Sequence, residues 1–168
     1  MQAESEVAAI NMVYGAAAAG ARVLTSSSSP GIALKQEGIG YISNAGLPAV
    51  IINMMRGGPG LGTIQPGQAD YNMTVKGGAN GDYHNVVLAP ASVQEAVNMV
   101  MEAFDIADQY LLPVIILADG LIGQMMEPVE FNYVPRPNLP EKTWALVGHY
   151  GAERSNIKNL VIEPDECE

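Results

Sequence analysis

The sequence predicts an α/β fold: an open, mainly parallel sheet with helices on both faces. Short runs rich in apolar and β-branched residues, typical of buried parallel strands, occur at residues 22–25, 49–55, 85–89 and 113–118. Segments with helix caps or helical periodicity alternate with these runs, and such alternation implies right-handed crossovers between parallel strands. The residues best suited to bind a ligand follow directly after a run, where ligands bind in this fold class.

The composition limits the classes of function. A chain of 168 residues has the length of one domain, and 48% hydrophobic residues are enough to build a core. Only 15% of the residues are charged, which suggests that partners cover much of the surface. The formal net charge of −10 argues against a nucleic-acid ligand, because phosphate binding needs clustered Lys and Arg.

Cysteine, histidine and hydropathy patterns bear on metals and location. The single cysteine, Cys167, allows neither an internal disulfide nor a thiolate-bound cluster, and it fits a reducing cytoplasm. His84 and His149 are not in a metal-ligand spacing, so we expect no metal site on this chain. The acidic first residues lack the basic region of a signal peptide, and no apolar run is long enough to span a bilayer. We expect a cytoplasmic protein.

The first helix is expected at residues 5–19, with Ser5 as its N-cap and Gly20 as its end. Glu6 then lies in the first turn, where a carboxylate complements the helix dipole. The helix that follows Glu6 carries no other charge, however, and a lone carboxylate at a buried helix costs free energy unless something pairs with it. Glu6 is therefore either a dipole-complementing residue or a functional carboxylate.

A row of serines follows the first strand, in Ser26-Ser-Ser-Ser-Pro-Gly31. Pro30 suits the start of the next helix, expected at residues 32–45, and the serines can cap it. Hydroxyl groups at a helix N-terminus also form a site for an anion or a polar ligand. Both interpretations, cap and ligand site, fit the pattern.

Arg56 ends the most apolar strand, at residues 49–55, and is followed by glycines at 57, 58, 60 and 62. Its planar guanidinium suits a carboxylate or a phosphate, because it donates two parallel hydrogen bonds. The glycines allow the backbone to approach a ligand closely. The alternative is a salt-bridged arginine in a surface turn.

The second half of the domain repeats the alternation. A long loop at 59–81 precedes the strand at 85–89, and the capping box Ser92-Val-Gln-Glu95 begins a helix at 92–110. The last strand, 113–118, is followed by Asp119, which is expected to cap the next turn rather than to bind a ligand.

The proline-rich region after Gly123 differs in character from the rest. Pro135, Pro137 and Pro140 indicate an extended arm that lies on another surface, and residues beyond Trp144 show no clear periodicity. We therefore divide the chain into a partial α/β domain at 1–126 and, at 127–168, the arm with the start of a further region.

Together, several motifs resemble one family, the alpha subunits of 2-oxoacid:ferredoxin oxidoreductases. The family motifs are Gln2-Ala-Glu-Ser-Glu-Val-Ala-Ala9, Thr25-Ser-Ser-Ser-Ser-Pro-Gly31, Arg56-Gly-Gly-Pro-Gly60 and Ser92-Val-Gln-Glu-Ala96. Lys76-Gly-Gly, Gly81-Asp-Tyr83 and Gly123-Gln-Met-Met-Glu-Pro128 are most similar to the branch that acts on 2-oxoisovalerate (3-methyl-2-oxobutanoate). The resemblance covers nearly the whole chain.

The resemblance implies the pyrimidine-binding domain of a thiamine diphosphate enzyme. Glu6 matches the glutamate that hydrogen-bonds the aminopyrimidine ring and so activates the cofactor, and Arg56 matches an arginine that holds the substrate carboxylate. The positions that match the lining of the cofactor site are Ser28, Ser29, Pro30, Gly31 and Gly57.

The resemblance also implies an assembly. A beta subunit would bind the cofactor diphosphate with Mg²⁺ and carry an iron–sulfur cluster, beside gamma and ferredoxin-like delta subunits. The reaction would decarboxylate a branched-chain 2-oxoacid oxidatively, pass electrons to ferredoxin and form an acyl-coenzyme A.

One departure from the family leaves alternatives open. Family members carry a strand and a helix before the position of Gln2, with a Tyr-Pro-Ile-Thr-Pro motif that does not occur in this sequence. The sheet would then lack its first strand–helix unit and could self-associate into a homo-oligomer. A non-catalytic assembly module of the same family, or a stand-alone binder of a small anion, would also fit.

Overall fold

The protein forms one parallel sheet between two layers of helices. The structure, a computed structural model, describes residues 1–148 and 156–158. The elements in chain order are α1 (Glu6–Ala18), β1 (Leu24–Ser27), α2 (Ser29–Asn44), β2 (Ala49–Met55), α3 (Tyr71–Val75), β3 (Val86–Leu88), α4 (Val93–Tyr110), β4 (Pro113–Asp119) and the 3₁₀ turn η1 (Ile122–Gln124). Within the described residues the strand order is β1-β2-β4-β3, and every pairing is parallel.

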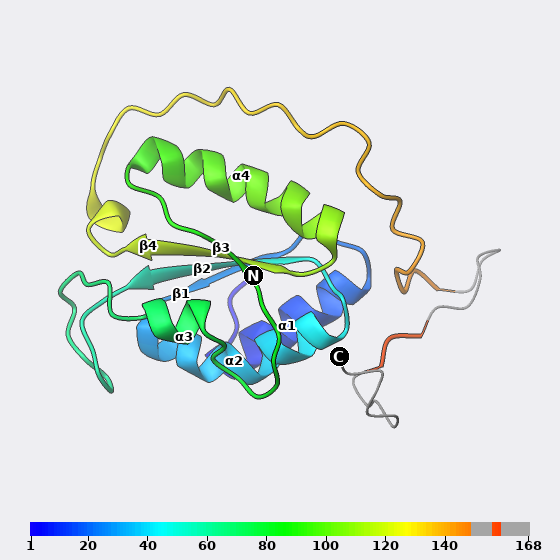
Figure 1. The fold of residues 1–168 in the computed structure, drawn as a ribbon, viewed down its shortest axis with the longest axis horizontal. Coiled ribbons are helices and arrows are strands. Elements are labelled where there is room, and N and C mark those ends of the chain that lie inside the picture. Colours follow the sequence, from blue (N-terminus) through cyan, green and yellow to red (C-terminus); the bar gives the residue numbers. More distant parts are fainter. Residues whose placement is uncertain (149–155, 159–168) are drawn as a thin grey trace.

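Helices cover both faces of the sheet, as the sequence predicted. Figure 1 shows α1, α2 and α3 on one side of the strands and α4 on the other. Alternate residues of β2 belong to different halves of the core: Ile51 packs in the cluster formed with α1 and α2, and Val50 packs in the cluster formed with α4. Because both faces are buried, β2 and β4 have continuous apolar sequences rather than alternating ones.

The helix boundaries follow their capping residues. Ser5 Oγ accepts a hydrogen bond from Ala8 N (3.2 Å), which confirms Ser5 as the N-cap of α1. At α4 one half of the expected capping box forms, because Ser92 Oγ accepts from Glu95 N (3.1 Å), whereas the Glu95 carboxylate accepts from Ala91 N (2.7 Å), one residue before the N-cap. These side chains satisfy backbone donors that have no partner within the helix.

Three elements differ from the sequence-based expectation by more than one residue. The helix α2 begins at Ser29, three residues before its expected start at 32. β1 spans Leu24–Ser27 rather than residues 22–25, because its pairing with β2 runs from Leu24↔Val50 to Ser27↔Asn53. Pairing register, not apolar content, sets the limits of this outer strand, and Ser26 and Ser27 are part of it. The region expected to be a loop, 59–81, contains the short helix α3.

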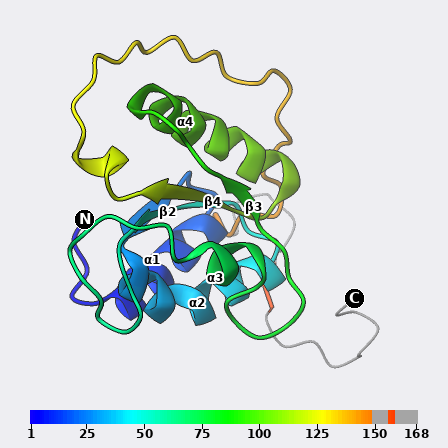
Figure 2. The ribbon, with the colours of Figure 1, turned by 60° about the vertical axis from the view of Figure 1, so that its left-hand side comes forward.

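The arm, residues 127–148, lies along α4 of the same chain (Figure 2). Gln94 exchanges two hydrogen bonds with the backbone of Glu130, at 2.8 and 2.9 Å. Further along, Leu146 N donates to Ala18 O (2.8 Å), so the arm reaches the end of α1. The surface that the arm covers is therefore the outside of its own α/β domain.

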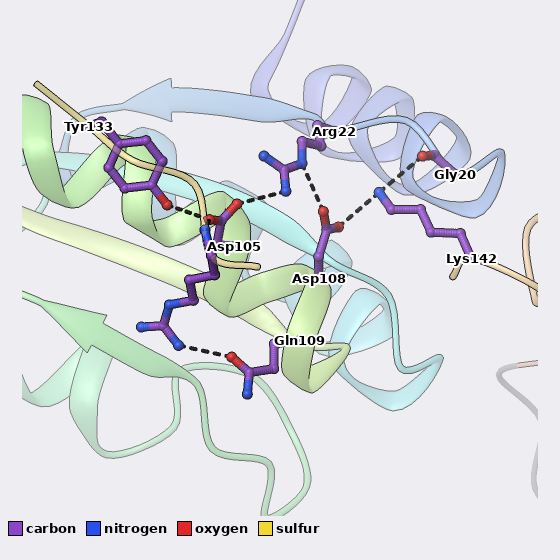
Figure 3. Close-up of polar contacts among 8 residues, drawn as sticks. Gly20, Arg22, Asp105, Asp108, Gln109, Tyr133 and Lys142 are labelled. Carbon is purple, nitrogen blue, oxygen red and sulfur yellow. Dashed lines mark hydrogen bonds and ion pairs between the residues drawn. The ribbon is translucent and has the colours of Figure 1, made fainter. Parts of the chain in front are cut away.

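A cluster of charged residues, which we call the clasp, fixes the arm and the α1–β1 connection to α4 (Figure 3). Arg22 contacts Asp105 (2.7 Å) and Asp108 (2.8 Å), and Lys142 contacts Asp108 (2.8 Å). The side chain of Asp105 has no exposed surface, and its carboxylate also accepts from the Tyr133 hydroxyl and from Arg136 N (2.7 Å). Both carboxylates are thus paired, as buried charges must be.

The clasp shifts the titration of its members. Burial opposes ionisation of Asp105, but the hydrogen bonds from Tyr133, Arg136 N and Arg22 outweigh it and lower the pKa of Asp105. Burial, together with the hydrogen bond to Asp105, raises the pKa of Tyr133 to about 12.

Across the part of the chain that the structure describes, no helix is both long and apolar enough to cross a membrane.

We predict that Asp105→Asn lowers the free energy of unfolding by about 2–3 kcal/mol, because an amide cannot accept from all three donors that now contact the carboxylate. Urea denaturation measures the change, and Glu141→Gln at an exposed position is the control. The lowered pKa of Asp105 means that its contribution is complete above its ordinary value of 3.8 and is lost as the pH falls through the folded-state pKa. Equal stability of wild type and Asp105→Asn at neutral pH would contradict this role.

Candidate functional site

The residues that the sequence singled out converge at the carboxyl ends of β1 and β2. In Figure 1 the arrowheads of β2 and β4 point to the same side of the molecule. The first turns of α1 and α2 lie at this edge, since Gly31 lies against Glu6 and Ser29 is bonded to Arg56. Glu6, the segment 26–31 and Arg56 therefore form one continuous region, although Glu6, unlike the other two, lies before the first strand.

Glu6 lines a cleft of about 370 Å³ at this edge. The cleft lies between the segment that leads into α1 and the strand β1, and Lys35 contributes to its wall. Glu6 is partly buried, and its carboxylate has no hydrogen-bond partner within the described residues. The carboxylate complements the start of α1 and is also free to accept a hydrogen bond from a ligand.

Gly31 lets the first turn of α2 pack directly against Glu6. A Cβ at residue 31 would overlap Ser27 Oγ and would lie 3.1 Å from Glu6 Oε1. A side chain here would displace either the strand end or the carboxylate. Pro30, the second residue of α2, precedes this contact and fits the fixed φ of a first helical turn.

The serines at the start of α2 divide into two roles. Ser28 is the N-cap residue, but its side chain makes no capping hydrogen bond. Ser29 is buried and joins α2 to the end of β2, because its Oγ accepts from Arg56 N (3.0 Å) and donates to Arg56 O (3.3 Å). The serine row therefore links the start of α2 to the end of β2 and makes no side-chain capping bond at Ser28.

Arg56 keeps part of its guanidinium without a partner. Its Nη2 donates to Leu61 O (2.9 Å), whereas its Nε is buried and has no hydrogen-bond partner. Arg56 forms no ion pair within the described residues, so the structure does not support the interpretation as a salt-bridged surface arginine. An unsatisfied buried donor costs free energy that a bound anion could recover.

The glycine-rich segment after Arg56 folds back on itself. Gly57 N donates to Gln65 O (2.9 Å), and Thr63 N donates to Gly57 O (2.8 Å). Gly62 has a φ of +66° and faces Gly57 O so closely that a side chain would overlap it. This closed loop supplies Leu61 O, which orients the Arg56 guanidinium.

Lys35 is the site residue that sequence reasoning missed. Its side chain is buried, with 2% of the residue exposed, and its Nζ donates to Thr25 Oγ1 (2.8 Å) and Ser26 O (3.1 Å). Burial lowers the pKa of Lys35, and the negative charge of Glu6 partly offsets this effect. Its spacing from the buried residues Ile32 and Ile39 places it on the apolar face of the helix, a signal that could have identified it.

Of the remaining candidates, Asp119 lies at the same edge of the sheet, opposite Met55, but does not line the Glu6 cleft. Asp119 Oδ1 accepts from Leu121 N (2.8 Å), and this bond, followed by one from Gln68, lowers the pKa of Asp119, which confirms its role in capping a turn. His84 is exposed and contacts Asp82 O, as expected for a loop histidine, whereas His149 and Cys167 fall outside the described residues. No group of three or more His, Cys, Asp or Glu in the described part of the chain could hold a metal ion.

The fold and the site together define an α/β domain with a candidate ligand site at one edge of its sheet. A parallel sheet presents, at its carboxyl edge, a free carboxylate, a helix start without side-chain bulk and an incompletely paired guanidinium. Residues 1–144 match the thiamine diphosphate-binding family of pyruvate flavodoxin/ferredoxin oxidoreductases. The chain belongs to this family, which confirms the resemblance noted in the sequence.

Known relatives cover the whole chain. It is 54% identical over 168 residues to the ketoisovalerate oxidoreductase subunit VorB of Methanothermobacter thermautotrophicus and 55% identical to that of Methanothermobacter marburgensis. It covers 48% of each, so the chain spans about half the length of these curated relatives. The 2-oxoglutarate synthase subunit KorA of Archaeoglobus fulgidus is 46% identical over 130 residues, which are 77% of this chain and 37% of that one.

A solved structure supports the fold. The 2-oxoglutarate:ferredoxin oxidoreductase from Magnetococcus marinus superimposes with a TM-score of 0.69 at 35% identity, over 71% of this chain and 21% of that one. That structure contains 2-oxoglutarate, coenzyme A and succinyl-CoA.

We predict that Ser29→Ala destabilises the fold by about 1–2 kcal/mol, because the buried backbone N–H of Arg56 loses its acceptor. Ser28→Ala is the matched control, since the Ser28 side chain makes no capping bond, and its effect should stay within about 0.5 kcal/mol. Urea denaturation of both variants measures the difference. Equal effects of the two substitutions would show that the link between Ser29 and Arg56 is not a stabilising one.

Proposed function

We propose that this chain is part of an alpha-type subunit of a thiamine diphosphate-dependent 2-oxoacid:ferredoxin oxidoreductase, and that its edge residues hold the cofactor's aminopyrimidine and the substrate. The observation that carries the proposal is the Glu6 carboxylate. It lines a cleft at the carboxyl edge of the sheet, lacks a hydrogen-bond partner within the described residues and belongs to a domain of a thiamine diphosphate-binding family.

The residues present fit thiamine diphosphate in chemical terms. Glu6 offers an acceptor for a ring nitrogen, and the absence of a side chain at Gly31 lets α2 pack against that carboxylate without displacing it. Ser28 has a hydroxyl that no capping bond occupies, and Pro30 and Gly57 border the same edge. We assign the pyrimidine end of the cofactor to this chain and the diphosphate end, with its Mg²⁺, to a beta subunit.

Glu6 and Arg56 then have distinct roles, one toward the cofactor and one toward the substrate. Thiamine diphosphate, when bound, supplies the carbanion chemistry that decarboxylation of a 2-oxoacid requires. Glu6 holds or releases a proton at its Oε toward the aminopyrimidine ring nitrogen, and exclusion of water strengthens that hydrogen bond. Arg56 binds the substrate carboxylate through its guanidinium, which Leu61 O orients and which makes no ion pair within the described residues.

We further propose a branched-chain 2-oxoacid as substrate. Relatives named ketoisovalerate oxidoreductase subunits are 54–55% identical over the full chain, whereas the KorA relative from Archaeoglobus fulgidus matches 130 residues at 46%. The expected assembly contains beta, gamma and ferredoxin-like delta subunits that carry iron–sulfur clusters and use ferredoxin and coenzyme A. We expect it to be cytoplasmic.

A non-catalytic assembly module of the same family is the second candidate. The two candidates differ in one outcome: the module would join the partner subunits normally without supporting turnover. A homo-oligomer without partner subunits would likewise support no turnover.

We predict that Glu6→Gln abolishes thiamine-dependent oxidation of 2-oxoisovalerate in the full subunit assembled with its partners, because an amide cannot exchange a proton with the ring nitrogen. The loss should be on the order of 100-fold or more in kcat, measured with an artificial electron acceptor. Glu37→Gln on the exposed side of α2 should retain full activity. Undiminished turnover by Glu6→Gln would refute the assigned role.

Arg56→Lys should raise KM for the 2-oxoacid and lower kcat/KM on the order of 100-fold, because lysine keeps the charge but loses the planar pair of donors. Steady-state kinetics with 2-oxoisovalerate, 2-oxoglutarate and pyruvate measure both the loss and the substrate preference. The apparent affinity for the electron acceptor should not change. A lower kcat with an unchanged KM would argue against substrate binding by Arg56.

A further inference from the structure

Lys35 has no task in the function proposed above, yet its placement is unusual. It sits within the buried face of α2 and is 2% exposed, although its neighbours Ile32 and Ile39 on this face are apolar. Lysine is almost never fully buried unless it is paired, because the ammonium loses its hydration. A fully apolar residue would pack at this position without that cost.

The hydrogen bonds of Lys35 do not neutralise its charge. Thr25 Oγ1 and Ser26 O, the two acceptors of its Nζ, are both neutral. No carboxylate lies within 4.0 Å of the Lys35 Nζ in the described part of the chain, so Lys35 forms no direct ion pair there. Lys35 is thus a buried cation anchored to β1 by two neutral groups.

The charged groups that share the cleft with Lys35 indicate which carboxylate its ammonium acts on. Glu6 in the first turn of α1 and Glu4 before it are the acidic residues of the cleft, and the residues of β1 that line it carry no charge. Glu4 is exposed to solvent, whereas Glu6 is partly buried and interacts electrostatically with Lys35. Solvent screens the exposed Glu4 carboxylate more strongly than that of Glu6. The electric field of the Lys35 ammonium therefore acts mainly on Glu6.

We propose that Lys35 is a positioning residue for Glu6: the buried ammonium, fixed by Thr25 and Ser26, attracts the Glu6 carboxylate and holds it at the cleft wall that the two residues share. The inference rests on the proposed role of Glu6. With the cofactor bound, a protonated Glu6 would transfer its proton to the aminopyrimidine ring nitrogen: the O–H bond would break as the N–H bond forms, and no other bond would change. A neighbouring positive charge stabilises the carboxylate side of this transfer.

The test measures activation of the cofactor without turnover. The full subunit in its assembled complex is loaded with thiamine diphosphate, and the exchange of the thiazolium C2 proton for deuterium is followed by rapid quench and NMR. Lys35→Met keeps the length of the side chain, and Lys35→Gln keeps a hydrogen-bond donor, while both remove the charge. Lys158→Met removes the same charge at an exposed position and is the control.

Both Lys35 variants should slow the exchange about tenfold, and Lys158→Met should leave it unchanged. In a Glu6→Gln background, Lys35→Gln should cause no further slowing, because the two residues act on the same proton. Calorimetry with thiamine diphosphate and urea denaturation establish that the variants bind the cofactor and fold. If Lys35→Met does not fold, Lys35→Gln alone decides the outcome.

Two results would overturn the inference. The first is an unchanged exchange rate in Lys35→Gln, and the second is that Lys35→Gln slows the exchange equally in the wild-type and Glu6→Gln backgrounds. The second would mean that Lys35 only stabilises the fold around the cleft. The proposed function fails separately, if Glu6→Gln itself exchanges as fast as the wild type.

Discussion

The contact between Gly31 and Glu6 is the constraint on which the candidate site depends. Because residue 31 has no side chain, the first turn of α2 packs against the end of β1 and the start of α1 at once. Ser29, two residues earlier, is then in position to bond both backbone groups of Arg56 at the end of β2. One short segment therefore holds a carboxylate on one side and a guanidinium on the other. A Cβ at residue 31 would separate the parts of the site without changing any of its polar groups.

Charge is distributed between a structural region and a functional one. The clasp pairs Arg22 and Lys142 with the two buried aspartates of α4, so these charges are satisfied within the chain. At the carboxyl edge the opposite holds: the Glu6 carboxylate has no hydrogen-bond partner in the described residues, and Arg56 Nε is buried without one. Paired charges stabilise the fold, and unpaired ones remain available to a ligand. This contrast is the physical reason for placing the site at the edge and not at the clasp.

Sequence reasoning recovered most of the architecture because local signals and tertiary packing agree. The apolar runs of β2 and β4, the N-caps Ser5 and Ser92 and the glycine-rich turn after Arg56 each determine a feature that the structure confirms. The limits of β1 could not be predicted, since they depend on its register with β2. The path of the arm along α4 was not predicted, because it depends on clasp contacts between residues far apart in the chain. The helix α3 was not predicted either, because it is a single short turn. Lys35 was missed because a lysine within a helix usually extends to solvent. The division at residue 126 remains a prediction.

The central claim is that the cleft beside Glu6 binds the aminopyrimidine of thiamine diphosphate, and a cryo-EM structure of the assembled complex with the cofactor tests it most directly. The account predicts the ring nitrogen within hydrogen-bond distance of the Glu6 carboxylate, with Gly31 beside it and the Arg56 guanidinium facing the substrate. A cofactor bound elsewhere, with the Glu6 carboxylate in contact only with solvent, would contradict the account.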